Sequence, residues 1–137
     1  MFCLLRFVVA TGALKFRPKQ RLAHARQFEA VYGARVSRSS GPLVVHGLPN
    51  GLAFFRLGLS VGKRAGNAVT RNGHKRRVRE AFRHVQEELA ELGGAEMDLV
   101  VVVRAHEPLS AAEYRRMLVE LVGKVVGDWG KKIANGT

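Results

Sequence analysis

The sequence has 137 residues, 47% of them hydrophobic, which suffices to bury one globular core and excludes a chain disordered by composition. It carries 23 Lys and Arg against 11 Asp and Glu, and this net charge of +12 implies a polyanionic partner, nucleic acid first and an anionic membrane surface second. The single cysteine, Cys3, excludes an intrachain disulfide and suits a reducing, cytoplasmic setting, and the five histidines show no metal-ligand spacing.

The first fifteen residues form an apolar segment that is too short to cross a membrane. It is interrupted by Arg6, whereas a membrane span needs about 20 apolar residues and a signal peptide carries its charge before the apolar run. We expect residues 1–15 to be a disordered N-terminal extension or an upstream start, with a targeting or membrane-touching segment as the alternative. One domain over residues 16–128 and a flexible tail over residues 129–137 are expected to follow.

The N-terminal half of the domain predicts one helix and a small set of strands. From Ala23 to Tyr32 apolar residues recur at helical spacing, and Gly33 is the stop signal. Residues 34–48 and 52–62 are expected to be strands on either side of a turn at residues 49–51.

The second of these strands predicts a sheet with one buried and one open face. Its apolar residues alternate from Phe55 to Val61 and are expected to face the core. The other face is small, polar and partly aromatic, because it carries Phe54, Arg56, Gly58 and Ser60.

The C-terminal half predicts a long helix, a buried strand and a last helix. The long helix is expected over Ala68–Leu92, ended by Gly93 and Gly94, and the aliphatic run Leu99–Val103 is typical of a strand buried on both faces. Residues 110–113 form a capping box that begins the last helix. The order αβββαβα, or αββαβα, indicates a single-domain α/β (α+β) sandwich around a small central sheet, with the long basic helix after the third strand.

Most of the positive charge lies at the start of the long helix. Residues 63–83 hold eight Lys and Arg and only one acid, Glu80, whereas the second half of the helix alternates with glutamates as a solvated face does. Opposite the apolar stripe lie Asn72, Arg76, Arg79 and Arg83. Arg71, His74 and Lys75 lie where the apolar stripe would continue toward the start of the helix. The first two turns of the helix are therefore expected to project past the core. This pattern predicts phosphate binding.

The loop before this helix combines glycines and cations over residues 60–67. It does not fit the nucleotide-binding pattern G-x-x-x-x-G-K-S/T, because no Ser or Thr follows Lys63. The backbone amides at the start of the helix can still bind phosphate of any kind, including an RNA backbone.

Two stretches of the sequence resemble one known family. Residues 59–83, LSVGKRAGNAVTRNGHKRRVREAFR, are similar to the signature of the bacterial ribonuclease P protein, roughly G-L-S-V-x-K-K-x-G-N-A-V-x-R-N-R-x-K-R-x-x-R-E-x-F. Upstream, Arg21-Leu22 followed by Phe28, Val31 and Tyr32 is similar to the family's R-L-x-x-x-x-x-F-x-x-V-F/Y. The resemblance spans about residues 17–127.

The resemblance implies a protein that breaks no bond itself and holds no catalytic residue, metal or cofactor. A large RNA that requires Mg²⁺ would cleave the 5′ leader from precursor tRNA, and the protein would bind that RNA and the leader, with no membrane or obligate protein partner. Contacts to the RNA are implied for Lys63, Arg64, Asn67, Arg71, Asn72, Lys75, Arg76 and Arg79.

The resemblance also implies a cleft for the single-stranded leader between the first helix and the open sheet face. It would be formed by Phe28, Tyr32, Arg56 and Ser60, and aromatic faces beside cations do bind single strands with little sequence preference. Phe28 and Tyr32 could instead be ordinary helix-to-sheet packing.

The sequence departs from the family signature at two positions. Gly73 stands where the third residue of R-N-R is expected, and His46 stands where an aromatic residue is expected near the end of the second strand. The loss at Gly73 is either neutral or makes room for an RNA backbone that approaches the helix.

Other classes of protein remain open from the residues alone. A ribosomal or ribosome-assembly factor would use the same basic helix without needing the cleft. A DNA-binding module would need a short recognition helix beside a dimer interface, of which there is no sign. A protein enzyme is least favoured, because the sequence shows no paired carboxylates, nucleophile–base pair or metal cluster.

Overall fold

The computed structural model describes residues 20–92 and 96–134, so the expected N-terminal extension lies outside the described residues. The elements follow the expected order αβββαβα, with one short 3-10 helix, η2, before α3. In chain order they are α2 (Ala25–Gly33), β1 (Ser37–Ser40), β2 (Leu43–Pro49), β3 (Arg56–Val61), η2 (Lys63–Ala65), α3 (Ala68–Ala90), β4 (Met97–Val103) and α4 (Ala111–Ala134).

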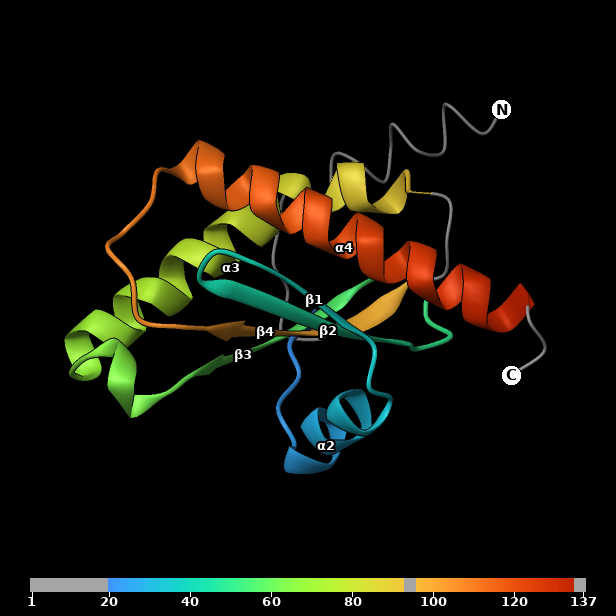
Figure 1. The fold of residues 1–137 in the computed structure, drawn as a ribbon, viewed down its shortest axis with the longest axis horizontal. Helices are drawn as coiled ribbons and strands as arrows, with labels where there is room; N and C mark the ends of the chain where they lie inside the picture. Colours follow the sequence, from blue (N-terminus) through green and yellow to red (C-terminus); the bar gives the residue numbers. More distant parts are fainter. Residues whose placement is uncertain (1–19, 93–95, 135–137) are drawn as a thin grey trace.

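The four strands form one sheet in the order β1-β2-β4-β3. β1 and β2 are antiparallel neighbours, β2 and β4 are also antiparallel, and β3 runs parallel to β4. Parallel neighbours need a crossover connection, and α3 supplies it. Figure 1 shows α3 and α4 on one face of the sheet and α2 alone on the other. One sheet face is therefore covered by two long helices, and the other only in part.

The main core lies between the sheet and the two long helices. Alternate residues of β2 and β3 face it, and the expected apolar stripes of α3 and α4 pack against them. The largest fully buried side chains there include Tyr114, Phe82, Leu43, Leu89 and Met97. The expected aliphatic strand is confirmed as β4, in which every residue except Val102 is buried.

A second, smaller apolar cluster holds α2 against the other face of the sheet. Val31 of α2 is fully buried there with Leu22 and Val100, and Phe28 packs against them. This cluster covers only the centre of the face, so the rest of the face stays open beside α2.

The expected strand boundaries were wrong in two places. Residues 34–48 are not one strand, because a turn at Gly41 and Pro42, with Gly41 at φ 56°, divides them into β1 and β2. β3 begins at Arg56 rather than residue 52. Asn50 holds the preceding loop in a turn, since its side chain accepts from the Leu52 amide at 2.8 Å and donates to the Phe54 carbonyl at 3.1 Å.

The expected projection of the first two turns of α3 beyond the core was also wrong at His74. His74 is only 1% exposed, because the segment after β4 folds over that part of the helix and His106 stacks on it. At the other end of the chain, residues 129–134 are helical where a flexible tail was expected. Trp129 explains the extension, since its side chain packs on the core and its Nε1 donates to the Gly47 carbonyl at 2.8 Å.

Candidate nucleic-acid interface

The basic surface begins at the junction between β3 and α3. Lys63 and Arg64 lie exposed in η2, and the chain then turns into α3 through Gly66, at φ 134°. An L side chain is strained at that φ, and a Cβ on Gly66 would stand 2.9 Å from Thr70. Asn67 is the N-cap of α3, with its Oδ1 accepting from the Thr70 amide at 2.9 Å. Asn67 therefore has a structural role, and the residue is exposed.

The predicted side chains of α3 divide between its outer surface and one flank. Asn72 and Arg76 are exposed on the outer surface, whereas Arg71, Lys75 and Arg79 are half-buried. Burial, together with the charge of nearby Arg21, lowers the pKa of Arg79 from its ordinary value. The charge of Arg21 near Arg79 adds to the positive potential of this flank. This flank is suited to a phosphate.

None of the eight predicted RNA-contacting residues forms a salt bridge with another described residue. The one acid among residues 63–83 pairs elsewhere: Glu80 binds Arg83 and His84, and hydrogen bonding from Arg83 lowers the pKa of Glu80. The charge of Arg83 is therefore compensated within the helix. The positive charge of the predicted residues is not, which is the electrostatic requirement for binding a polyanion.

The predicted leader cleft lies on the open sheet face beside α2. Phe28 is largely packing, because its ring covers Gly58 and contacts the cluster around Leu22. Tyr32 is different: it is 37% exposed and meets the His46 ring edge-on at 4.9 Å between ring centroids. Next to it, the half-buried part of the face is formed across three strands by Val44, Val102 and Ser60.

The histidine that replaces the expected aromatic residue is part of this face. Desolvation lowers the pKa of His46, so the imidazole is favoured in its neutral form. Its Nδ1 is buried without a hydrogen-bond partner among the described residues. A neutral ring beside Tyr32 gives a flat, uncharged surface on which bases can stack.

Arg56, the fourth predicted cleft residue, is held in a bidentate salt bridge. Its Nε and Nη2 donate to the two oxygens of Asp98 at 2.6 Å each, and Asn50 also donates to Asp98 at 3.0 Å. This hydrogen bonding raises the pKa of Arg56. Arg56 lies on the cleft face. Because Asp98 neutralises it and joins it to β4, Arg56 stabilises the sheet and is less available to bind a phosphate.

Sequence reasoning missed one cluster entirely. His74 of α3 stacks on His106, with ring centroids 4.5 Å apart, and His106 bonds to the Tyr114 hydroxyl at 2.7 Å. No local signal indicates this contact, since the two histidines come from segments on either side of β4. Within residues 20–92 and 96–134, no three His, Cys, Asp or Glu side chains are grouped to hold a metal ion. No described helix is long and apolar enough to span a membrane.

Comparison with known proteins gives one family. Residues 16–126 match the family model described as Ribonuclease P. The ribonuclease P protein component of Streptococcus pneumoniae (strain Hungary19A-6) is 36% identical over 103 residues, which cover 74% of this chain and 80% of that protein.

Solved structures give the same result. The ribonuclease P protein of Thermotoga maritima superposes with a TM-score of 0.65 at 29% identity, covering 76% of this chain and 96% of that one. The Staphylococcus aureus ribonuclease P protein has a TM-score of 0.60 at 28% identity, covering 78% of this chain and 97% of that one.

Proposed function

The chain belongs to the ribonuclease P protein family, and on that premise we propose that it helps a catalytic RNA to remove the 5′ leader from precursor tRNA. In this proposal the RNA subunit and its Mg²⁺ supply the cleavage chemistry, and the protein binds no cofactor of its own. Its part is to hold the RNA subunit and the leader. A cytoplasmic location is proposed with it, in keeping with the single cysteine.

One observation carries the proposal: two separate surfaces suited to nucleic acid lie on one small domain. The first is the uncompensated basic surface of η2 and the start of α3, and the second is the open sheet face with Tyr32. Cations contact phosphates without reading sequence, so the first surface fits a large structured RNA. Stacking tolerates any base, so the second fits the variable leader of many precursors.

The main competing function, assistance in ribosome assembly, would use the basic surface but not the cleft. Because both functions use the basic surface, they are distinguished by which RNA this surface binds more tightly. The full chain is titrated with a transcribed bacterial ribonuclease P RNA and with a ribosomal RNA fragment of similar length, over a range of salt concentrations. We expect tighter binding to the ribonuclease P RNA.

The salt dependence tests whether phosphates are contacted. If about six are bound, log K is expected to fall by several units for each tenfold rise in salt. Arg76→Ala should make the slope shallower by about one unit, because it removes one contact. Lys124→Ala is the matched control, since Lys124 pairs with Glu120 on α4 outside the basic surface. A slope near zero, or equal effects of the two variants, would contradict the proposal.

A further inference from the structure

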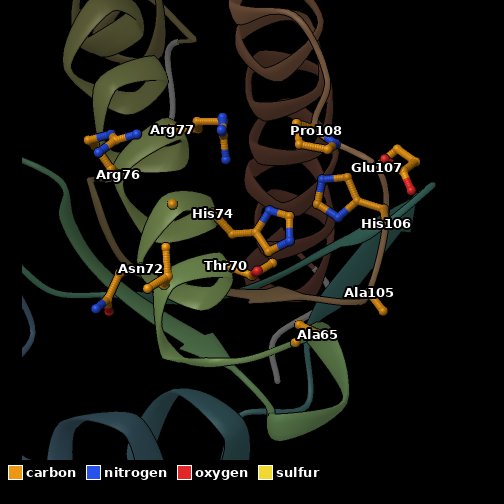
Figure 2. Close-up of a pocket in the computed structure, with 13 residues that line it drawn as sticks. Ala65, Thr70, Asn72, His74, Arg76, Arg77, Ala105, His106, Glu107 and Pro108 are labelled. Carbon is orange, nitrogen blue, oxygen red and sulfur yellow. The ribbon is translucent and has the colours of Figure 1, made fainter.

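A second concave region lies on the other flank of α3, away from Arg21 and Arg79. It is a groove of about 1090 Å³ between the start of α3 and the segment that follows β4 (Figure 2). Small-molecule sites in proteins measure about 300–1,000 Å³, so an open groove of this size has room for a nucleotide. Neither the predicted RNA contacts nor the leader cleft accounts for most of its lining.

The back of this groove is formed by the imidazoles of His74 and His106, which stack at an interplanar angle of 21°. Figure 2 shows the two rings facing each other. His106 is fixed in orientation, because its Nδ1 bonds to the Arg104 carbonyl at 2.8 Å and its Nε2 to the Tyr114 hydroxyl. A carbonyl only accepts, so Nδ1 carries a proton and donates it to Arg104. The half-buried His106 ring is therefore a rigid, flat surface.

His74 behind it has a further property. It is 1% exposed, and neither of its ring nitrogens bonds to another described residue. A buried polar group without a partner costs about 1–3 kcal/mol, so such groups are uncommon in structural cores. His74 thus places an imidazole at the back of the groove without a hydrogen-bond partner among the described residues.

The α3 side of the groove is both cationic and apolar. Arg76 and Arg77 line it, and neither forms a salt bridge within the described part of the chain. Gly73 keeps this side open, and the Arg77 guanidinium lies over it, 3.0 Å from where a Cβ would stand. Val69 also lines the groove and is 80% exposed, which is unusual for an aliphatic side chain.

The opposite side carries a carboxylate, Glu107, which is exposed and forms no salt bridge with a described residue. A carboxylate repels an RNA backbone, so its presence in a basic region does not fit simple phosphate binding. An ionised carboxylate can only accept hydrogen bonds. It fits the donor groups on the edge of a nucleobase, as acidic side chains do when they accept from cytosine N4 in DNA complexes.

We propose that this groove binds one unpaired nucleotide of the RNA partner and reads its base. The base lies against Val69 and His106, its phosphate is held by Arg76 and Arg77, and its Watson–Crick edge donates to Glu107. Guanine fits best, because its N1–H and N2–H₂ are adjacent donors that match two carboxylate oxygens. Uracil fits worst, because its one N–H lies between two carbonyl oxygens. The proposal rests on the proposed function only in that the partner is RNA.

The test uses heptanucleotides of equal charge that differ in one base. The full chain is titrated with a heptauridylate and with the same oligonucleotide carrying guanosine, adenosine or cytidine at its centre. The guanosine probe should bind at least about fivefold more tightly than heptauridylate, with the other two between them. Glu107→Gln, which replaces one acceptor oxygen by a donor, should reduce this preference to within about twofold.

Two control variants locate the effect. Glu87→Gln makes the same change of charge on the exposed second half of α3 and should keep the guanosine preference. Tyr32→Ala should also keep it, although it weakens binding of all four probes through the leader cleft. If Tyr32→Ala abolishes the preference and Glu107→Gln does not, the base is read in the cleft and the groove proposal is wrong.

The remaining outcomes are equally decisive. If Glu107→Gln tightens all four probes by the same factor, Glu107 only repels the backbone and no base is read. If the wild-type chain shows no preference yet supports precursor-tRNA cleavage, the groove proposal fails and the proposed function stands. If the preference is present and is abolished by Glu107→Gln, but the chain does not support cleavage, the groove proposal stands and the proposed function fails.

Discussion

The ring of Phe28 lies directly on Gly58, so that a Cβ built on Gly58 would stand 2.6 Å from Phe28 Cζ. Glycine weakens a strand, since it loses more backbone entropy on folding than other residues and buries no side chain. Here it allows α2 to approach β3, and this approach positions the open face of the sheet next to Tyr32.

Gly58→Ala is therefore expected to push Phe28 away from the sheet and to lower the free energy of unfolding by about 1–3 kcal/mol, as overpacking does. Urea unfolding measures this. Gly33→Ala is the control, because nothing lies within 4 Å of the added methyl group. Equal stabilities for the two variants would show that α2 adjusts without cost.

Tyr32 should act on the leader rather than on the fold, because its side chain is partly exposed. Tyr32→Ala is expected to weaken binding of leader-bearing precursor tRNA by roughly 1–3 kcal/mol and to leave mature tRNA unaffected. Phe28→Ala should instead lower the unfolding free energy markedly, since Phe28 packs in the cluster under α2. An equal loss for precursor and mature tRNA with Tyr32→Ala would mean that Tyr32 does not contact the leader.

The order of elements and the apolar stripes could be predicted because they depend on local periodicity. The stripe from Val78 to Leu89 is a property of neighbouring residues, and the structure confirms it. The capping box is confirmed in one half, because the Glu113 amide donates to Ser110 Oγ, whereas the Glu113 carboxylate accepts from the Ser110 hydroxyl rather than from its amide. The basic surface could be predicted for the same reason, since its cations are close in sequence.

Contacts between distant segments could not be predicted in this way. The resemblance placed Arg56 in the leader cleft, but nothing local indicated its carboxylate partner, Asp98, which lies 42 residues away. The stacking of His74 on His106 depends on how the chain leaves β4. The turn at Gly41 was missed because the residues on both sides of it suit a strand.

The histidine stack predicts a pH dependence of stability. Burial lowers the pKa of His74 from its ordinary value of 6.5, and the nearby His106 and Arg77 lower it further. Below about pH 6.5 the unfolded chain binds a proton at this histidine that the folded chain resists. The contribution of His74 to the unfolding free energy is therefore fully present above that pH and is lost as the pH falls through the lowered pKa. Desolvated His46 contributes in the same direction.

His74→Phe should keep the stacking on His106 and remove this part of the dependence. Unfolding free energies measured between about pH 5 and pH 8 should then fall less steeply on the acid side than in the wild-type chain. His84→Gln is the control, because His84 is exposed. A wild-type slope in His74→Phe would show that protons bind elsewhere.

Substitutions at Gly73 test whether its departure from the family signature is neutral or whether the space beside it is needed for the RNA to approach. Gly73→Ala should raise the unfolding free energy by about 0.5–1 kcal/mol, because the added methyl group meets only the flexible end of Arg77. Gly73→Arg should also stabilise the free protein, but the groove beside Gly73 favours a weaker complex with RNA, since the side chain fills the groove. Tighter binding by Gly73→Arg than by Gly73→Ala would indicate the neutral loss.

The central claim is that this chain assists a catalytic RNA, and cleavage in a reconstituted mixture tests it most directly. The full chain is combined with a transcribed bacterial ribonuclease P RNA and a leader-bearing precursor tRNA at low Mg²⁺, where the RNA alone cleaves slowly. We predict faster release of the 5′ leader when the chain is added, and no release by the chain without the RNA. An unchanged cleavage rate, with the chain folded and bound to the RNA, would contradict the account.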